Sequence, residues 1–163
     1  MGHRTGDGRT AVERRSGREL VVTRSFDAPV AMVFDAWTRP ELFKLWWAPR
    51  SSGVPLLSCE MDVRAGGGYG VTFGRDAANA MTFFGRYLEV VPPSRLVWTN
   101  DESEAGAVTT VTFEEEGGGT RLVLRELYPS TEALDEAFVG MEDAMPEQFA
   151  QLDELLVTLR AGV

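Results

Sequence analysis

The 163-residue sequence contains one histidine and one cysteine, and this scarcity excludes several kinds of site. His3 stands alone near the N-terminus, so Ser-His-Asp and Cys-His catalysis and histidine-rich metal sites are excluded. The lone Cys59 rules out an internal disulfide and a cysteine-rich metal centre. It falls in the strand-like run LLSCEMDVR, where we expect a small buried hydrophobic residue. We therefore expect no metal and no cofactor.

Long apolar runs are also absent. No run approaches the ~18–20 residues that span a bilayer, and the N-terminal segment MGHRTGDGRTAVERRSGRE lacks the apolar stretch of a secretory signal. We therefore expect a cytoplasmic protein without a membrane span. A hydrophobic content of 44% is ordinary for a soluble globular protein, and the length suits about one domain.

Positive charge is scarce beyond the start of the chain. Residues 1–18 hold five arginines and two acidic residues, a net charge of +3, whereas the whole chain carries −9. Residues 19–163 therefore carry −12, and a domain this acidic repels nucleic acid. We predict a disordered basic tail over residues 1–18 and one folded domain over residues 19–163.

Two short helices are predicted within residues 26–49. Pro29 is expected in the first turn of the first helix, with Asp27 close enough to help cap its start. The pattern Thr38-x-x-Glu41 predicts a capping box that starts a second helix, from residue 39 to about 47. The first helix has one apolar face, formed by Val30, Val33, Phe34 and Trp37.

A curved antiparallel sheet and a long C-terminal helix are predicted next. Pro146 is expected in the first turn of that helix or at a kink, after a shorter helical segment over residues 131–138. One helix cannot fill a wide concave sheet, so a cavity should remain between them. The apolar stripe of the helix consists of Phe149, Leu152, Leu155, Leu156 and Leu159. The seven predicted strands cover residues 19–25, 55–64, 69–74, 81–91, 95–100, 107–115 and 120–128.

A series of short motifs runs in order through about residues 20–160. They are FDAP (26–29), VFDAWT (33–38), PE (40–41), WWAP (46–49), DVRAGG (62–67), Gly85, PPSRL (92–96), GTRL (119–122), GME (140–142) and LDEL (152–155). This ordered set resembles the heat shock protein 90 ATPase activator homologues, a branch of the START-like (SRPBCC) superfamily.

The resemblance implies an α+β helix-grip fold, with about seven strands wrapped around the long C-terminal helix and two short helices after the first strand. It also implies a hydrophobic internal pocket, but no ligand shared by all members. This chain departs from the family at Ala144-Met145-Pro146, where members often have Gly-Trp. The departure predicts a later start or a bend in the terminal helix.

Our leading hypothesis is a small soluble protein that binds an apolar or aromatic small molecule between the sheet and the terminal helix. Trp46 and Trp47 either gate the pocket or plug the core, and the second role is favoured for at least one of them. Monomer and homodimer both remain open. The candidate ligand-binding residues are Trp46, Trp47, Tyr69, Phe73, Phe83, Tyr87, Trp98, Glu126, Tyr128, Met141, Met145 and Phe149.

Two rival functions remain. Glu126 alternates with Leu122 and Leu124 in an apolar strand, and an inward carboxylate would have a raised pKa suited to general acid or base catalysis. Glu126 is therefore the catalytic candidate of a cyclase- or hydratase-type enzyme. The third hypothesis is a chaperone-associated interaction module, which requires an exposed apolar patch. Asp62 and Arg64 are expected to form a salt bridge rather than a ligand site.

Overall fold

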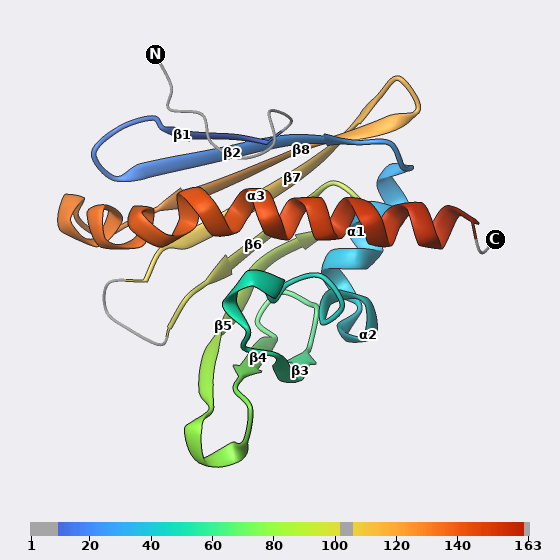
Figure 1. The fold of residues 1–163 in the computed structure, drawn as a ribbon. Coiled ribbons are helices and arrows are strands. Elements are labelled where there is room, and N and C mark those ends of the chain that lie inside the picture. The colour runs from blue at the N-terminus through green and yellow to red at the C-terminus, as the bar shows by residue number, and fades with distance from the viewer. Residues whose placement is uncertain (1–9, 102–105, 162–163) are drawn as a thin grey trace.

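The computed structural model describes residues 10–101 and 106–161, in which a long helix lies along one face of a curved antiparallel sheet (Figure 1). The strand order is β1-β2-β8-β7-β6-β5-β4-β3. The strands are β1 (Ala11–Arg14), β2 (Glu19–Phe26), β3 (Leu56–Met61), β4 (Gly68–Phe73), β5 (Met81–Val91), β6 (Arg95–Thr99), β7 (Val108–Glu116) and β8 (Gly119–Leu127). The helices are α1 (Val30–Thr38), α2 (Pro40–Phe43) and α3 (Thr131–Ala161), with short 3-10 turns over Arg50–Ser52 and Ala77–Asn79.

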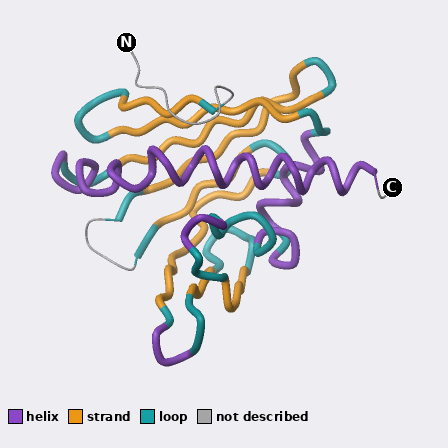
Figure 2. The backbone as a smooth tube through the Cα atoms, viewed as in Figure 1, coloured by secondary structure: helices purple, strands orange, loops and turns teal. Residues whose placement is uncertain are grey.

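This arrangement confirms the predicted α+β helix-grip fold, in which the sheet wraps around the C-terminal helix. Helices α1 and α2 lie at one end of the sheet, and the hairpin of β4 and β5 projects away from α3 (Figure 2). None of the described helices is long and apolar enough to cross a membrane. The seven predicted strands correspond to β2 through β8.

The eighth strand corrects the predicted tail. β1 pairs with β2 in antiparallel register, from Ala11 opposite Thr23 to Arg14 opposite Leu20. Its Val12 is fully buried, and this burial together with strand pairing orders a run that its charge alone would leave in solvent. The prediction of disorder is therefore wrong for residues 11–14, whereas residues 1–9 lie outside the described part of the chain.

The two short helices form, but their predicted caps do not. Pro29 is the N-cap of α1 rather than a first-turn residue, and no side chain caps that end. Thr38 Oγ1 instead donates to the carbonyl of Phe34 at 2.9 Å, which removes it from the predicted capping box. Arg39 is the N-cap of α2, again without a side-chain hydrogen bond. α2 ends at Phe43, and turns carry the chain on to Trp47.

α3 is one helix of 31 residues with Pro146 in its interior. The predicted start of the helix at Pro146 and the separate segment over residues 131–138 are therefore wrong. A proline in a helix costs about 3 kcal/mol, but Met145, Phe149 and Leu152 are buried on both sides of it and hold the helix against the sheet. Packing of the apolar face thus overrides the local preference.

The core contains an aromatic cluster around Trp37, which is 1% exposed. Its ring centroid lies 4.8 Å from that of Trp46 and 6.2 Å from that of Phe149. Most of these contacts are edge-to-face, the geometry that aromatic quadrupoles favour. Trp98 and Phe113 complete the cluster from the sheet side. This end of the space between the sheet and the helices is therefore filled.

Candidate functional site

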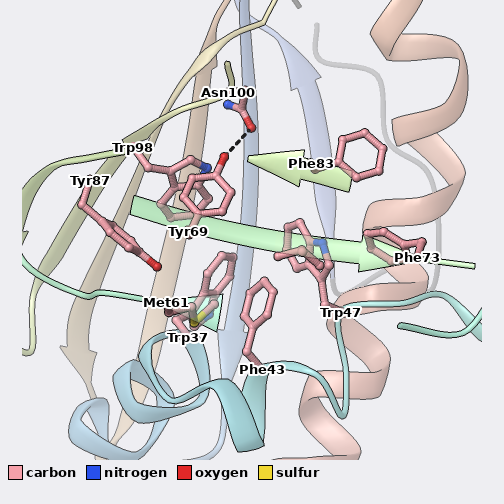
Figure 3. Close-up of a pocket in the computed structure, with 11 residues that line it drawn as sticks. Trp37, Phe43, Trp47, Met61, Tyr69, Phe73, Phe83, Tyr87, Trp98 and Asn100 are labelled. Carbon is pink, nitrogen blue, oxygen red and sulfur yellow. Dashed lines mark hydrogen bonds between the residues drawn. The ribbon is translucent and has the colours of Figure 1, made fainter. Parts of the chain in front are cut away.

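A cavity of about 190 Å³ borders this cluster, and we call it the aromatic cavity (Figure 3). Its wall is built by α1, α2, the turn after α2, and strands β3 to β6. The lining residues are Trp37, Phe43, Trp47, Met61, Tyr69, Val71, Phe73, Phe83, Tyr87, Trp98 and Asn100.

A second cavity of about 430 Å³ adjoins the first, and we call it the acidic cavity. Trp47, Phe83, Trp98 and Asn100 line both cavities, so the two share a wall. The acidic cavity extends from this wall to the first half of α3. Its remaining lining residues are Gly106, Ala107, Glu126, Tyr128, Ala133, Glu136, Ala137, Met141 and Met145.

A chain of hydrogen bonds links the two cavities. The Tyr69 hydroxyl donates to the Thr99 carbonyl at 2.7 Å and lies 3.3 Å from Asn100 Oδ1 (Figure 3). Asn100, which lines both cavities, donates through Nδ2 to Thr109 Oγ1 at 3.0 Å. Thr109 Oγ1 donates to Glu126 Oε2 at 2.9 Å, and the Tyr128 hydroxyl donates to Glu126 Oε1 at 2.8 Å. Glu126 therefore accepts one hydroxyl hydrogen bond at each oxygen.

Glu126 points inward, as predicted. It is 7% exposed and borders the acidic cavity. Burial raises the pKa of the Tyr128 hydroxyl, and the neighbouring Glu126 raises it further. Tyr128 thus stays protonated at neutral pH and acts as a donor to the carboxylate. An ionised carboxylate is an acceptor only, which matches the two donors around Glu126.

Most of the residues expected to line a pocket do so. Trp47, Phe83 and Trp98 line both cavities, whereas Trp46 and Phe149 line neither. Trp46 is fully buried, and its Nε1 donates to the carbonyl of Ala36 at 2.9 Å. Of the tryptophan pair, Trp46 therefore plugs the core and Trp47 lies at the cavities. The other predicted residues at the cavities are Tyr69, Phe73, Tyr87, Glu126, Tyr128, Met141 and Met145.

Sequence reasoning missed several lining residues. Ala133 and Ala137 precede Met141 and Met145 at a constant spacing of four, which places all four on one stripe of α3. That spacing could have predicted a helix face whose small side chains, those of Ala133 and Ala137, leave space against the sheet. Asn100 carried no comparable signal. The other missed lining residues are Trp37, Phe43, Met61, Val71, Gly106, Ala107 and Glu136.

Helix α3 holds the turn that carries Trp47. Gln151 Nε2 donates to the carbonyls of Trp46 and Ala48, at 2.9 Å in each case. Gln148 Nε2 donates to the carbonyl of Trp47 at 2.5 Å. These bonds satisfy backbone acceptors in a turn with no regular partner, and they fix Trp47 at the wall shared by the cavities.

Two other groups were singled out by the sequence. Burial raises the pKa of the Cys59 thiol to about 11, so it stays protonated and poorly nucleophilic at neutral pH. Arg64 Nε lies 2.9 Å from Asp62 Oδ2, which confirms the expected salt bridge. Among the residues with a described position, no three histidine, cysteine, aspartate or glutamate side chains are grouped so as to hold a metal ion.

Solved structures share this fold at low sequence identity. A crystal structure of a protein from Rhodobacter sphaeroides has a TM-score of 0.84 and 24% identity, covering 92% of this chain and 99% of its own. A solution structure from Staphylococcus epidermidis has a TM-score of 0.73 and 27% identity, covering 91% and 94%. The AHSA1-like protein from Aeromonas hydrophila has a TM-score of 0.71 and 20% identity, covering 83% and 92%.

No functionally curated protein is similar enough in sequence to match this chain. A family model does match, over residues 27–157, and it describes the activator of Hsp90 ATPase homolog 1-like proteins. The matched region runs from the end of β2 into the last turns of α3 and contains both cavities. The chain therefore belongs to the family of activator of Hsp90 ATPase homolog 1-like proteins, within the START-like superfamily.

Proposed function

We propose that this protein binds a hydrophobic or aromatic small molecule between the sheet and α3. The observation that carries the proposal is the pair of adjoining cavities with a shared aromatic wall. Small-molecule sites are concave and mostly apolar, with a few placed polar groups and volumes of about 300–1,000 Å³. The acidic cavity alone is about 430 Å³, and the aromatic cavity extends it.

The shared wall also supplies a route for entry. Phe83 is 37% exposed and Trp47 is half-buried, although both line the two cavities. The Trp47 ring stacks on Phe43, with ring centroids 4.8 Å apart, so it forms a fixed side of this wall. Ligand entry beside Trp47, past the more exposed Phe83, is therefore part of the proposal.

Isothermal titration with the neutral probe 1-naphthalenemethanol tests the proposal. We expect a Kd of roughly 10–100 μM for a ligand of this size in an apolar site. Ala137→Phe adds a ring to the acidic cavity and should weaken binding at least about tenfold. Val139→Phe is the matched control, because Val139 lies on the same helix and is 72% exposed. Absence of binding to the wild type, or equal effects of the two variants, would contradict the proposal.

A second function, catalysis of cyclase or hydratase type, is supported by Glu126. A buried carboxylate at a cavity wall is a candidate general acid or base, and the hydroxyls of Thr109 and Tyr128 orient its two oxygens. Incubation with a cell extract should then yield products that are isomers of their precursors or differ by one water. The same extract with Glu126→Gln should show no such pairs, and pairs that persist would remove Glu126 from the mechanism.

A third function, that of an interaction module, is supported by the projecting strands β3 to β5. They expose apolar side chains of the kind that mark protein contacts. The family name points to a chaperone as a candidate partner. Mixing with a purified Hsp90-type chaperone should alter its ATPase rate, and no change would exclude this role. The exposed side chains are Leu57, Met81, Phe83, Phe84 and Leu88.

A further inference from the structure

The Tyr87 hydroxyl is a buried polar group in the wall of the aromatic cavity. Tyr87 lies on β5 opposite Trp98 of β6 and is 3% exposed. It lines the aromatic cavity, and Figure 3 shows its hydroxyl turned toward Met61. Within residues 10–101 and 106–161, no hydrogen bond to this hydroxyl is formed. Buried polar side chains in proteins are nearly always hydrogen-bonded, so this hydroxyl calls for a partner from outside the chain.

The neighbouring Tyr69 provides a contrast within the same wall. Its ring centroid lies 5.8 Å from that of Tyr87, and both residues line the aromatic cavity. The Tyr69 hydroxyl donates to the carbonyl of Thr99, at the end of β6, at 2.7 Å. It is turned toward Asn100 in Figure 3. The fold therefore uses the hydroxyl of Tyr69 as a structural donor and leaves that of Tyr87 for another role.

The surroundings of the Tyr87 hydroxyl favour a ligand over water. Burial raises the pKa of this hydroxyl, and the neighbouring Cys59 raises it further, so it stays protonated and able to donate at neutral pH. A water molecule in a cavity needs two to four polar partners. Met61, toward which the hydroxyl is turned, offers only a weakly accepting thioether. An acceptor atom of a ligand is therefore the better partner.

The other polar atoms of the wall are mostly donors. Trp37 Nε1 has no hydrogen-bond partner among the described residues, and Trp47 and Trp98 add two more indole N–H groups to the lining. An indole N–H can only donate. The Asn100 amide donates twice within the protein, at 2.6 and 3.0 Å, which leaves its oxygen as an acceptor in this wall. A wall with more donors than acceptors favours a ligand that carries acceptors.

The acceptor should be uncharged. The described lining of the aromatic cavity contains no charged side chain. An ionised ligand group would lose its water there without gaining a partner of opposite charge, which is strongly unfavourable. A ketone or ether oxygen accepts a hydrogen bond and loses much less hydration on burial. The cavity therefore favours a neutral oxygen.

We propose that the ligand is a neutral aromatic molecule with an oxygen acceptor on its ring, and that this oxygen accepts a hydrogen bond from the Tyr87 hydroxyl in the aromatic cavity. Tyr87 is then a specificity-determining residue, because a ligand of the same shape without the oxygen leaves a buried donor unpaired. This inference rests on the proposed function and names the chemical class of its ligand.

Three probes with one ring system test the inference by equilibrium dialysis at pH 7. In 1-acetonaphthone, a ketone oxygen is attached beside the ring. In 1-isopropenylnaphthalene, a CH₂ group replaces that oxygen with little change of shape. The third probe, 1-naphthoate, carries a charged carboxylate at the same position and should bind at least about tenfold more weakly than the ketone.

Tyr87→Phe removes only the hydroxyl group. It should weaken the binding of 1-acetonaphthone about fivefold to tenfold, as expected for one buried hydrogen bond. The affinity for 1-isopropenylnaphthalene should stay within about twofold of wild type, and its retention shows that the variant is folded. Tyr69→Phe is the matched control, because it makes the same change in the same wall. It should change the affinities for the two neutral probes by the same factor.

Thermal unfolding without ligand supplies an independent readout. Tyr87→Phe should leave the midpoint unchanged or raise it, because no described group bonds this hydroxyl. Tyr69→Phe should lower the midpoint, because the carbonyl of Thr99 loses its donor. A lower midpoint for Tyr87→Phe than for Tyr69→Phe would show that the Tyr87 hydroxyl is part of the fold and would overturn the inference.

The outcomes of the binding experiment separate the two proposals. If neither neutral probe binds to the wild type, the proposed function fails and the inference fails with it. If both bind and Tyr87→Phe does not selectively weaken the ketone, the cavity is upheld and the role of Tyr87 is overturned. Selective loss of the ketone in Tyr69→Phe alone would overturn it as well. If 1-naphthoate binds as tightly as the ketone, the neutral ligand class is overturned.

Discussion

The two halves of α3, before and after Pro146, meet the same sheet in different ways. In the second half, Phe149, Leu152 and Leu156 are at most 2% exposed and fill the core. In the first half, the stripe that faces the sheet begins with Ala133 and Ala137, and it borders the acidic cavity. A small side chain buries its own methyl group but leaves the opposite wall without a partner.

The difference separates stability from function within one helix. The second half carries large apolar residues and the glutamines that hold the turn of Trp47. The first half carries alanines, methionines and Glu136, which border open space. Leu134 is the fully buried exception in the first half. We therefore expect substitutions of the core residues after Pro146 to change the free energy of unfolding, and those of the cavity-lining residues before it to change ligand binding.

The largest effect on stability is expected from Phe149→Ala. Phe149 is fully buried, and its ring lies 6.0 Å from that of Phe26 and 6.2 Å from that of Trp37. Removing a buried phenylalanine ring costs about 3–5 kcal/mol. Urea unfolding followed by tryptophan fluorescence measures the loss. A loss below about 1 kcal/mol would show that this half of α3 is not part of the core.

Gln151→Ala should have the next largest effect, a loss of about 2 kcal/mol. Gln151 donates to the carbonyls of Trp46 and Ala48 and accepts from the backbone N–H of Arg50, and its loss leaves these groups without partners in a partly buried turn. Urea unfolding measures the change in stability. Because the turn carries Trp47, affinity for the neutral naphthyl probe should also fall, and an unchanged affinity would show that Trp47 does not depend on this contact.

Met141→Ala, before Pro146, should cost less than about 1 kcal/mol. Buried methionines usually lose 2–5 kcal/mol on truncation to alanine, but Met141 is half-buried and already borders the acidic cavity. Thermal unfolding compares it directly with Phe149→Ala. A loss as large as that of Phe149→Ala would mean that the first half of α3 is packed as tightly as the second.

The smallest effect concerns Glu147, next to Pro146. Hydrogen bonds from the hydroxyl and the backbone N–H of Ser51 lower the pKa of its carboxyl group in the folded state. A lowered folded pKa means that the contribution is present above the unfolded pKa of about 4.5 and is lost as the pH falls below it. At the surface it should amount to a few tenths of a kcal/mol.

Comparing the unfolding free energies of the wild type and Glu147→Gln at pH 6 and pH 3 tests this prediction. The wild type should lose slightly more stability on acidification than the variant. The opposite sign would show that the carboxylate does not contribute in its charged form.

The fold was largely predictable because its pattern is local. Alternating apolar residues and turn glycines marked β2 through β8, and the stripe from Phe149 onward marked the second half of α3. β1 was missed because Val12 stands among charged residues and is buried only through pairing with β2. The continuity of α3 was missed because the penalty of Pro146 is local, whereas the burial that overrides it is tertiary.

The large residues of the site and the presence of a cavity were predictable from the sequence, whereas the small residues that shape the cavity were not. Aromatic side chains on the strands and methionines near the terminal helix indicated a wall, and most of them line the cavities. Ala133 and Ala137 shape the acidic cavity because their side chains are too small to fill it. The hydrogen-bonded path from Asn100 through Thr109 to Glu126 joins three strands or strand ends, and no sequence spacing encodes it.

The central claim is that a small molecule occupies the space beneath the first half of α3. Methyl NMR of methionine-labelled protein with 1-naphthalenemethanol tests it most directly, because methionines lie both at the cavities and away from them. Met141 and Met145 line the acidic cavity and Met61 the aromatic cavity, whereas Met32 and Met81 line neither. The methyl signals of the cavity methionines should shift with saturation, and those of Met32 and Met81 should stay. No shift, or a shift confined to Met81 on the projecting hairpin, would contradict the account.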